Sequence, residues 1–158
     1  MTPDHTMTCP CRGYPITQHN EIRDVLAEVM SEVIYDVEVE PQLLSYAEED
    51  LSGRTANCSS EACVDIRARG FWTFFDIRVT HPKACLLSCP EVLGQLESNE
   101  REKKIQYAER INTVDRGVFT PLVSSTAGMT GHECGRYLKS LVSLIVSNLR
   151  TSICATQR

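Results

Sequence analysis

Hydrophobic residues recur along the chain at spacings that predict three helices. Residues 20–35 and 133–149 carry apolar side chains three and four positions apart, which is typical of amphipathic helices. Residues 99–115 have fewer apolar positions, which predicts a helix with one face toward solvent or a ligand. We expect Asn20 to be the N-cap of the first helix, with acidic residues in its first turn.

Alternating apolar and polar residues predict strands between these helices. Val37 to Glu40 form one alternating run that stops near Pro41. Residues 62–69 and 73–79 are two further strands joined by a tight hairpin, and residues 118–125 are the last strand. The segments 1–18, 45–60 and 83–98 are expected to be loops. The predicted order is helix, three strands, helix, strand and helix, which is an α/β (α+β) fold.

Two aspartates occur among apolar residues on the second and third predicted strands. Asp65 follows Cys63-Val64 and Asp76 follows Phe74-Phe75, and burying an unpaired carboxylate is costly. One solution is a divalent cation such as Mg²⁺ or Mn²⁺, which takes hard oxygen ligands and activates water at a phosphodiester. The other is a purely structural pairing with a nearby arginine. Spacing alone leaves both interpretations open.

Arg78 stands two residues after Asp76, as in an Asp…(Asp/Glu)-x-Lys nuclease signature with arginine at the basic position. The chain also contains, in this order, the segments HNEIRD (19–24), DIRARGFW (65–72), FFDIRV (74–79), EKKIQYAER (102–110) and FTPLVSSTAGM (119–129). Together they resemble the restriction-like, or PD-(D/E)XK, endonuclease domain at the C-terminus of reverse-transcriptase proteins of non-LTR retrotransposons and other mobile elements. The resemblance spans about residues 4–145.

This resemblance implies an αβββαβ core over residues 19–150, with a mixed sheet flanked by helices, followed by a C-terminal helix and a tail at 151–158. It implies a metal-dependent DNA endonuclease in which Asp65 and Asp76 bind Mg²⁺ or Mn²⁺. Arg78 stays protonated and cannot act as a base, so it or Lys103 would stabilise phosphate charge. Lys103 and Tyr107 match the family's Lys-x-x-x-Tyr motif and share a helix face.

Further site residues come from the same resemblance. On the first helix, Asp24 and Glu32 are candidates to assist the metal, but capping and surface pairing is the favoured interpretation of both, and Glu40 is a weaker candidate. The matches to the family's HN-x-x-RD segment on that helix are His19, Asn20, Arg23 and Asp24. The residues expected to contact the DNA backbone are Arg67, Arg69, Lys103, Lys104, Arg110 and Arg116.

Residues 1–18 resemble part of the zinc knuckle that precedes the nuclease core in this family. His5 and Cys9 match the last two of its four ligands, and Cys11 is an additional thiol. A closed structural zinc site takes four ligands, so the segment is interpreted as a truncated knuckle in which Zn²⁺ binding would be partial. The family's hairpin is also longer than this one, and a one-residue slip in its register would turn an aspartate away.

Charge is divided unevenly along the chain, whose formal net charge is −5. Residues 1–60 contain eleven acidic and three basic residues, whereas residues 61–158 contain ten acidic and thirteen basic ones. This balance disfavours broad coating of nucleic acid but permits one basic surface that meets DNA. Without an apolar span or a signal sequence, the expected location is nuclear or cytoplasmic, not membrane-bound or secreted.

The resemblance further implies a reverse transcriptase domain and element RNA as partners in a full-length protein. The alternative function is a catalytically inactive remnant that binds DNA or protein. A small secreted disulfide-rich protein is the third possibility for a chain with eight cysteines, and the missing signal sequence disfavours it.

Overall fold

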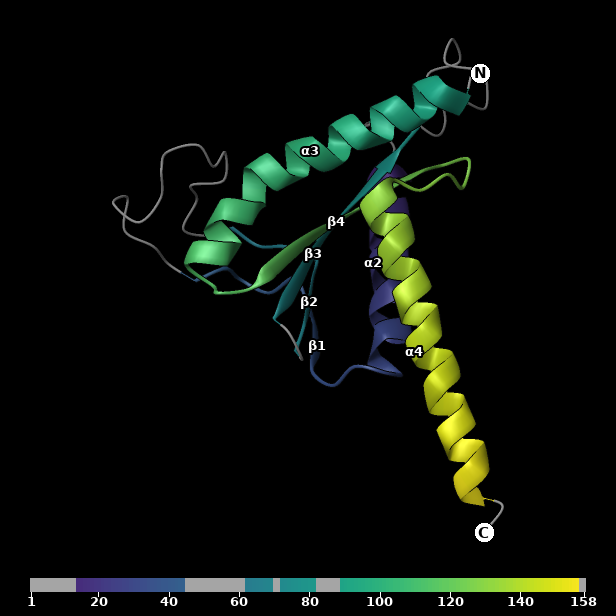
Figure 1. The fold of residues 1–158 in the computed structure, drawn as a ribbon. Coiled ribbons are helices and arrows are strands. Elements are labelled where there is room, and N and C mark those ends of the chain that lie inside the picture. The colour runs from purple at the N-terminus through teal and green to yellow at the C-terminus, as the bar shows by residue number, and fades with distance from the viewer. Residues whose placement is uncertain (1–13, 45–61, 70–71, 82–88, 157–158) are drawn as a thin grey trace.

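The computed structural model describes residues 14–44, 62–69, 72–81 and 89–156, and Figure 1 shows their arrangement. The fold is mixed α/β, and its elements follow the order predicted from the sequence. In chain order they are α2 (Tyr14–Ser31), β1 (Val37–Val39), β2 (Ile66–Ala68), β3 (Thr73–Thr80), α3 (Cys89–Thr113), β4 (Val118–Ser125) and α4 (His132–Thr156). None of these helices is long and apolar enough to cross a membrane.

The four strands form one mixed sheet in the order β1-β2-β3-β4. β1 pairs with β2 and β2 pairs with β3 in antiparallel fashion, whereas β3 and β4 are parallel. A parallel pair needs a long crossover connection, and α3 lies within the segment that joins β3 to β4. The sheet therefore combines a locally connected meander with one strand added through a helix.

Helices cover both faces of the sheet. α2 and α4 pack on the face that carries Phe75 and Ile77, with Met30 and Leu141 buried among them. α3 packs on the opposite face, where Phe74 lies in a second cluster with apolar residues of α3 and β4. Because successive side chains of a strand point to opposite faces, Asp76 shares the face of Phe74 and is directed toward α3.

Two helices begin earlier than the hydrophobic pattern predicts. α2 begins at Tyr14, so Asn20 lies inside the helix and is not its N-cap, and the first turn contains no acid. α3 begins at Cys89, so the loop expected over 83–98 is helical from residue 89. In each helix the second residue is a proline, Pro15 or Pro90. Proline is well tolerated in a first helical turn, where its missing N–H has no acceptor to serve.

α4 extends through Thr156, beyond the predicted end at residue 149 and into the segment predicted as a tail. Its first turn is capped by a side chain from α3. The buried Glu100 carboxylate accepts hydrogen bonds from the N–H groups of Glu133 at 2.9 Å and Cys134 at 3.4 Å. Gly131 permits this approach, because a Cβ there would lie 2.2 Å from Oε1 of Glu100. These hydrogen bonds connect α3 to the start of α4.

Candidate active site

The two aspartates singled out by the sequence lie opposite each other at the junction of β2 and β3. Asp76 lies within β3 and is only 6% exposed. Asp65 precedes β2 and is not within it as predicted, yet its N–H donates to the carbonyl oxygen of Phe75 at 3.0 Å. The N–H of Ile77 donates to Oδ2 of Asp65 at 2.5 Å. The short hairpin therefore keeps both carboxylates at one place in the sheet.

Lys103 of α3 completes this pair from above the sheet. Its Nζ lies 2.5 Å from Oδ2 of Asp76, and both side chains are largely shielded from solvent. Burial raises the pKa of Asp76, the Lys103 ammonium lowers it and the neighbouring Asp65 raises it, and the net direction is upward. A buried carboxylate with a raised pKa beside a second carboxylate is typical of catalytic sites and cation sites.

His19 reaches the site from α2. Its Nε2 lies 2.9 Å from Oδ1 of Asp65. The hydrogen bond to Asp65 raises the pKa of His19 more than burial lowers it, and the charge of Asp76 adds to the increase. The sequence resemblance includes His19 in a motif of the first helix, and the structure shows that its partner is Asp65. With Ile77 on one oxygen and His19 on the other, the Asp65 carboxylate is held in a fixed orientation.

Arg23 connects α2 to the strand that precedes the site. Its guanidinium donates to Oδ1 of Asp24 at 2.8 Å and forms an ion pair with Glu40. The N–H of Glu40 donates to the carbonyl oxygen of Asp65 at 2.9 Å, so Glu40 lies beside the site through its backbone. Asp24 thus pairs with Arg23, which agrees with the surface-pairing alternative for this residue.

Two helix-one candidates do not join the cluster. Glu32 is exposed and directly follows α2, thirteen residues from His19, which corresponds to about 20 Å along a helix. The structure therefore does not bring this candidate to the carboxylates. Asn20 lies in the helix interior and is partly buried next to His19. No hydrogen bond joins its side chain to another residue of the described ranges.

Arg78 and Tyr107 have different environments from those expected of catalytic groups. Arg78 is directed to the surface, where its Nη1 lies 2.6 Å from Oε2 of Glu102. The Nζ of Lys103 lies 5.6 Å from the centre of the Tyr107 ring, which is a cation–π distance. Tyr107 also packs against Phe119, with ring centroids 5.4 Å apart. Tyr107 therefore supports the side chain of Lys103 and belongs to the core beneath it.

Arg67 and Arg69 are expected to bind DNA, and they lie within β2 and directly after it. Each forms an ion pair with an acid at β1, Arg67 with Glu38 and Arg69 with Asp36. Both guanidiniums also approach the exposed Trp72 ring, at 5.6 and 5.3 Å from its centre. These two cations are exposed enough to meet a phosphate, but acids on the neighbouring strand compete for them.

Arg110 is a correction to the predicted DNA contacts. Its side chain is completely buried, and Nη2 donates to the carbonyl oxygen of Leu44 at 3.1 Å. Such a group stabilises the fold and cannot reach a nucleic acid. Lys104 remains exposed, 3.1 Å from Oε1 of Glu133, and Arg116 is exposed in the turn after α3.

The predicted zinc ligands His5 and Cys9 lie outside the described residues, as does Cys11. Within residues 14–44, 62–69, 72–81 and 89–156, no three or more His, Cys, Asp and Glu side chains are grouped so as to hold a metal. The candidate oxygen donors are therefore the two carboxylates of Asp65 and Asp76. Sequence reasoning did not find the Ile77 amide or the Glu102 partner of Arg78, since neither contact has a local sequence signal.

The cluster brings together two carboxylates, an ammonium and an imidazole from β3, the residue before β2, and the helices α2 and α3. This set can bind a cation through oxygen, place positive charge beside an anionic substrate and hold a carboxylate in one orientation. In comparisons with known proteins, no family model, no curated protein and no solved structure matches the chain.

Proposed function

We propose that this domain is a restriction-like, metal-dependent DNA endonuclease of the kind found in mobile elements. One observation carries the proposal: Asp65, Asp76 and Lys103, named from the sequence as nuclease residues, meet at one site. Lys103 Nζ lies 2.5 Å from Asp76, and Asp65 is bonded across the hairpin to the residue before Asp76 and the residue after it. The αβββαβ order, with the acids at the second and third strands, also supports this reading.

The donor set fits Mg²⁺ or Mn²⁺ bound by Asp65 and Asp76. Both ions prefer oxygen ligands, and burial together with the charge of Asp65 raises the pKa of Asp76. A cation at this place would offset that unfavourable charge, as cations do for clustered carboxylates. When bound, the metal supplies an activated water and neutralises charge at the phosphodiester.

The chain's own residues take distinct parts in this reaction. Lys103 places its ammonium beside Asp76, where it stabilises the negative charge that develops on the phosphate in the transition state. His19 and the Ile77 N–H hold the Asp65 carboxylate in position. The exposed Arg78 lies on the Asp76 side of β3, where it can contact a neighbouring phosphate.

A plasmid-nicking assay tests the proposal. Supercoiled DNA is incubated with the protein and Mg²⁺ or Mn²⁺, beside Asp76→Ala as the site variant and Asp24→Ala as an acid-deletion control outside the cluster. Nicking is expected from the wild type and from Asp24→Ala, with loss in Asp76→Ala and in EDTA. Equal nicking by both variants, or no nicking with either metal, contradicts the proposal.

A non-catalytic DNA-binding remnant is the second candidate. The observation in its favour is that the guanidiniums of Arg67 and Arg69 lie beside an exposed Trp72. It predicts DNA binding without cleavage under every metal condition. A partnership with a reverse transcriptase domain and element RNA stays a prediction from the resemblance.

A further inference from the structure

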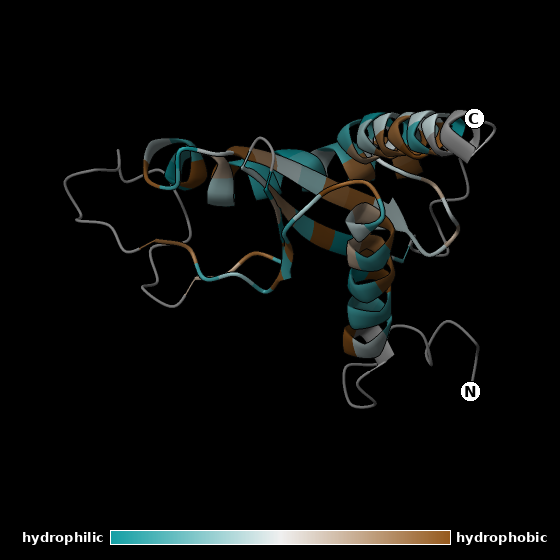
Figure 2. Cartoon of the chain, turned by 90° about the horizontal axis from the view of Figure 1, so that it is seen from below, coloured by the Kyte–Doolittle hydropathy of each residue, from teal (hydrophilic) through white to brown (hydrophobic). Residues whose placement is uncertain are grey.

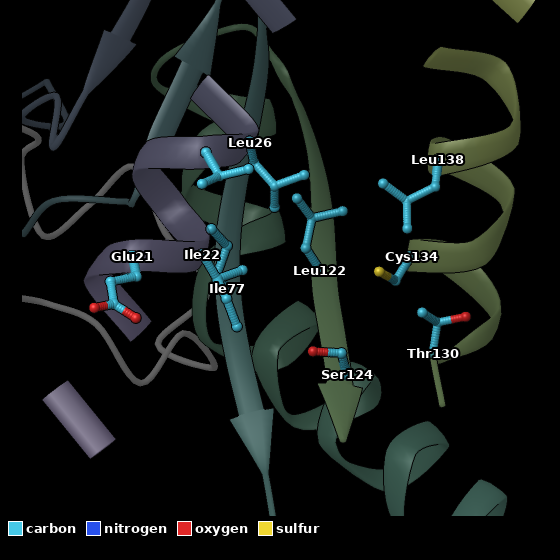
Figure 3. A pocket seen from close by; sticks show the side chains of 10 residues that line it. Glu21, Ile22, Leu26, Ile77, Leu122, Ser124, Thr130, Cys134 and Leu138 are labelled. Carbon is cyan, nitrogen blue, oxygen red and sulfur yellow. The ribbon is translucent and has the colours of Figure 1, made fainter. Parts of the chain in front are cut away.

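A second feature of the molecule lies on the sheet face opposite Asp76. Residues of α2, α4 and the sheet line a pocket of about 350 Å³ there. Figure 3 shows Ile22 and Leu26 of α2 and Leu138 of α4 directed into this space, above Leu122 of β4. Glu21 stands at its rim, and Val25 in its wall is 58% exposed. The pocket is open, almost entirely apolar and large enough for an apolar side chain.

The C-terminal half of α4 has an exposed apolar stripe. Val142, Val146 and Leu149 are four and three residues apart, so they lie along one side of the helix. Their exposed fractions are 58%, 41% and 58%. Figure 1 shows this half of α4 running past the sheet and past the end of α2, and brown hydrophobic segments continue along it in Figure 2. The helix therefore extends apolar surface beyond its own core.

Charge distinguishes the two surfaces. α4 contains no acid after Glu133, and its exposed half is flanked by Lys139 and Arg150. The outer side of α2 has the opposite sign, with Glu21 and Glu28 exposed on either side of Val25 and Glu32 just beyond. None of these three glutamates forms an ion pair with another described residue. A basic helix with an apolar stripe is thus the complement of an acidic helix with an apolar pocket.

We propose that these surfaces bind each other between two copies of the chain. The projecting half of α4 from each copy lies along α2 and over the pocket of the other copy. Within one copy the two surfaces do not meet, because Val142, Val146 and Leu149 are on the exposed side of α4. The exchange is reciprocal, so the same contact forms twice and the assembly closes as a twofold-symmetric dimer.

The dimer uses both kinds of complementarity. The apolar stripe covers Val25 and the pocket, while Lys139 and Arg150 face the glutamates of the partner's α2. Dimerisation therefore weakens as salt rises, since exposed charge pairs are screened. The proposed contact does not use Asp65, Asp76 or Lys103, because none of the three lines the pocket.

Analytical ultracentrifugation of the full chain over a range of concentrations tests the proposal. Leu149→Asp, at an exposed position, is expected to raise the dimer dissociation constant by at least about tenfold. Arg101→Glu, on the exposed surface of α3, is the matched control and should leave the constant unchanged. Circular dichroism verifies that each variant is folded. A wild type that stays monomeric, or a dimer that tolerates Leu149→Asp, overturns the proposal.

Charge reversal tests the reciprocal arrangement itself. One variant carries Glu21→Lys and Glu28→Lys on α2, and the other carries Lys139→Glu and Arg150→Glu on α4. Each alone is expected to be monomeric, because like charges then meet at both contacts. An equimolar mixture is expected to form heterodimers, since acidic α4 meets basic α2 and the other contact is unchanged. A mixture that stays monomeric overturns the reciprocal exchange, whatever the outcome of the nicking assay.

Discussion

Lys103 and Asp76 form a largely buried ion pair that joins α3 to the central strand of the site, with Nζ 2.5 Å from Oδ2. The adjacent Lys104 is directed elsewhere and pairs with Glu133 at the start of α4. Two consecutive lysines on one helix therefore have different neighbours, one at the carboxylate cluster and the other at a helix terminus. This difference provides a matched pair of substitutions.

Lys103→Met is expected to lower DNA cleavage by about a hundredfold or more, because it removes the positive charge from the place where phosphate charge develops. Lys104→Met, one residue away and outside the cluster, should keep a rate near that of the wild type. Single-turnover nicking with saturating enzyme measures both rates. Equal losses in the two variants would contradict the assignment of Lys103.

Asp76→Asn is expected to make the protein more stable at neutral pH while abolishing cleavage. Burial raises the pKa of Asp76 from its ordinary value of 3.8, so the ionised carboxylate disfavours the folded state even with Lys103 beside it. This cost is present at neutral pH and disappears as the pH falls below 3.8, where Asp76 is protonated in both states. Thermal unfolding across the acidic range compares variant and wild type, and a neutral-pH melting temperature below that of the wild type would refute the prediction.

His19→Gln is expected to destabilise the protein at low pH more than at high pH. The Asp65 hydrogen bond raises the pKa of His19 above 6.5, so the protonated imidazole stabilises the folded state. That contribution is complete below pH 6.5 and is lost as the pH rises through the raised value. Melting temperatures at about pH 5.5 and about pH 9 provide the measurement. His132→Gln, at an exposed histidine, is the control, and an equal effect of the two substitutions would exclude a special role for His19.

Gly131→Ala is expected to lower the free energy of unfolding by about 1–3 kcal/mol. The added Cβ would lie 2.2 Å from the Glu100 carboxylate, so the cap of α4 would have to shift. Gly94→Ala, inside α3 with no atom within 4 Å of the new Cβ, should instead stabilise by about 0.5–1 kcal/mol. Urea denaturation of the two variants measures both signs. If Gly94→Ala instead lowers the free energy of unfolding, helix propensity does not determine the stability change at this position.

Local patterns predicted much of this fold because several elements have strong local signals. The last strand occupies residues 118–125 as expected, and the sequence motifs contain Asp65, Asp76 and Lys103, which lie together in the fold. The helix starts at Tyr14 and Cys89 were missed because Pro15 and Pro90 were interpreted only as loop residues. Proline is also common in the first turn of a helix, so each of these prolines is compatible with either a loop or a helix start.

The remaining differences depend on contacts between distant parts of the chain. Arginine is usually found at the surface, but Arg110 is buried and its guanidinium donates a hydrogen bond to the carbonyl oxygen of Leu44. His19 and Asp65 are likewise brought together only by the packing of α2 on the sheet. The spacing of apolar residues within one element cannot predict such contacts, because they form only when separate elements pack together. The sequence could therefore name the site residues but not their partners.

The parallel pairing of β3 and β4 has a consequence for how the site forms in time. Asp65 and Asp76 are joined by a short hairpin, whereas α3 and its Lys103 are packed in place by a crossover of much longer sequence separation. Local pairings tend to form faster than distant ones, so we expect the two carboxylates to meet before the ammonium of Lys103 reaches Asp76. At that point the two like charges would repel each other, so we expect dissolved cations and protons to favour the pairing of β2 with β3.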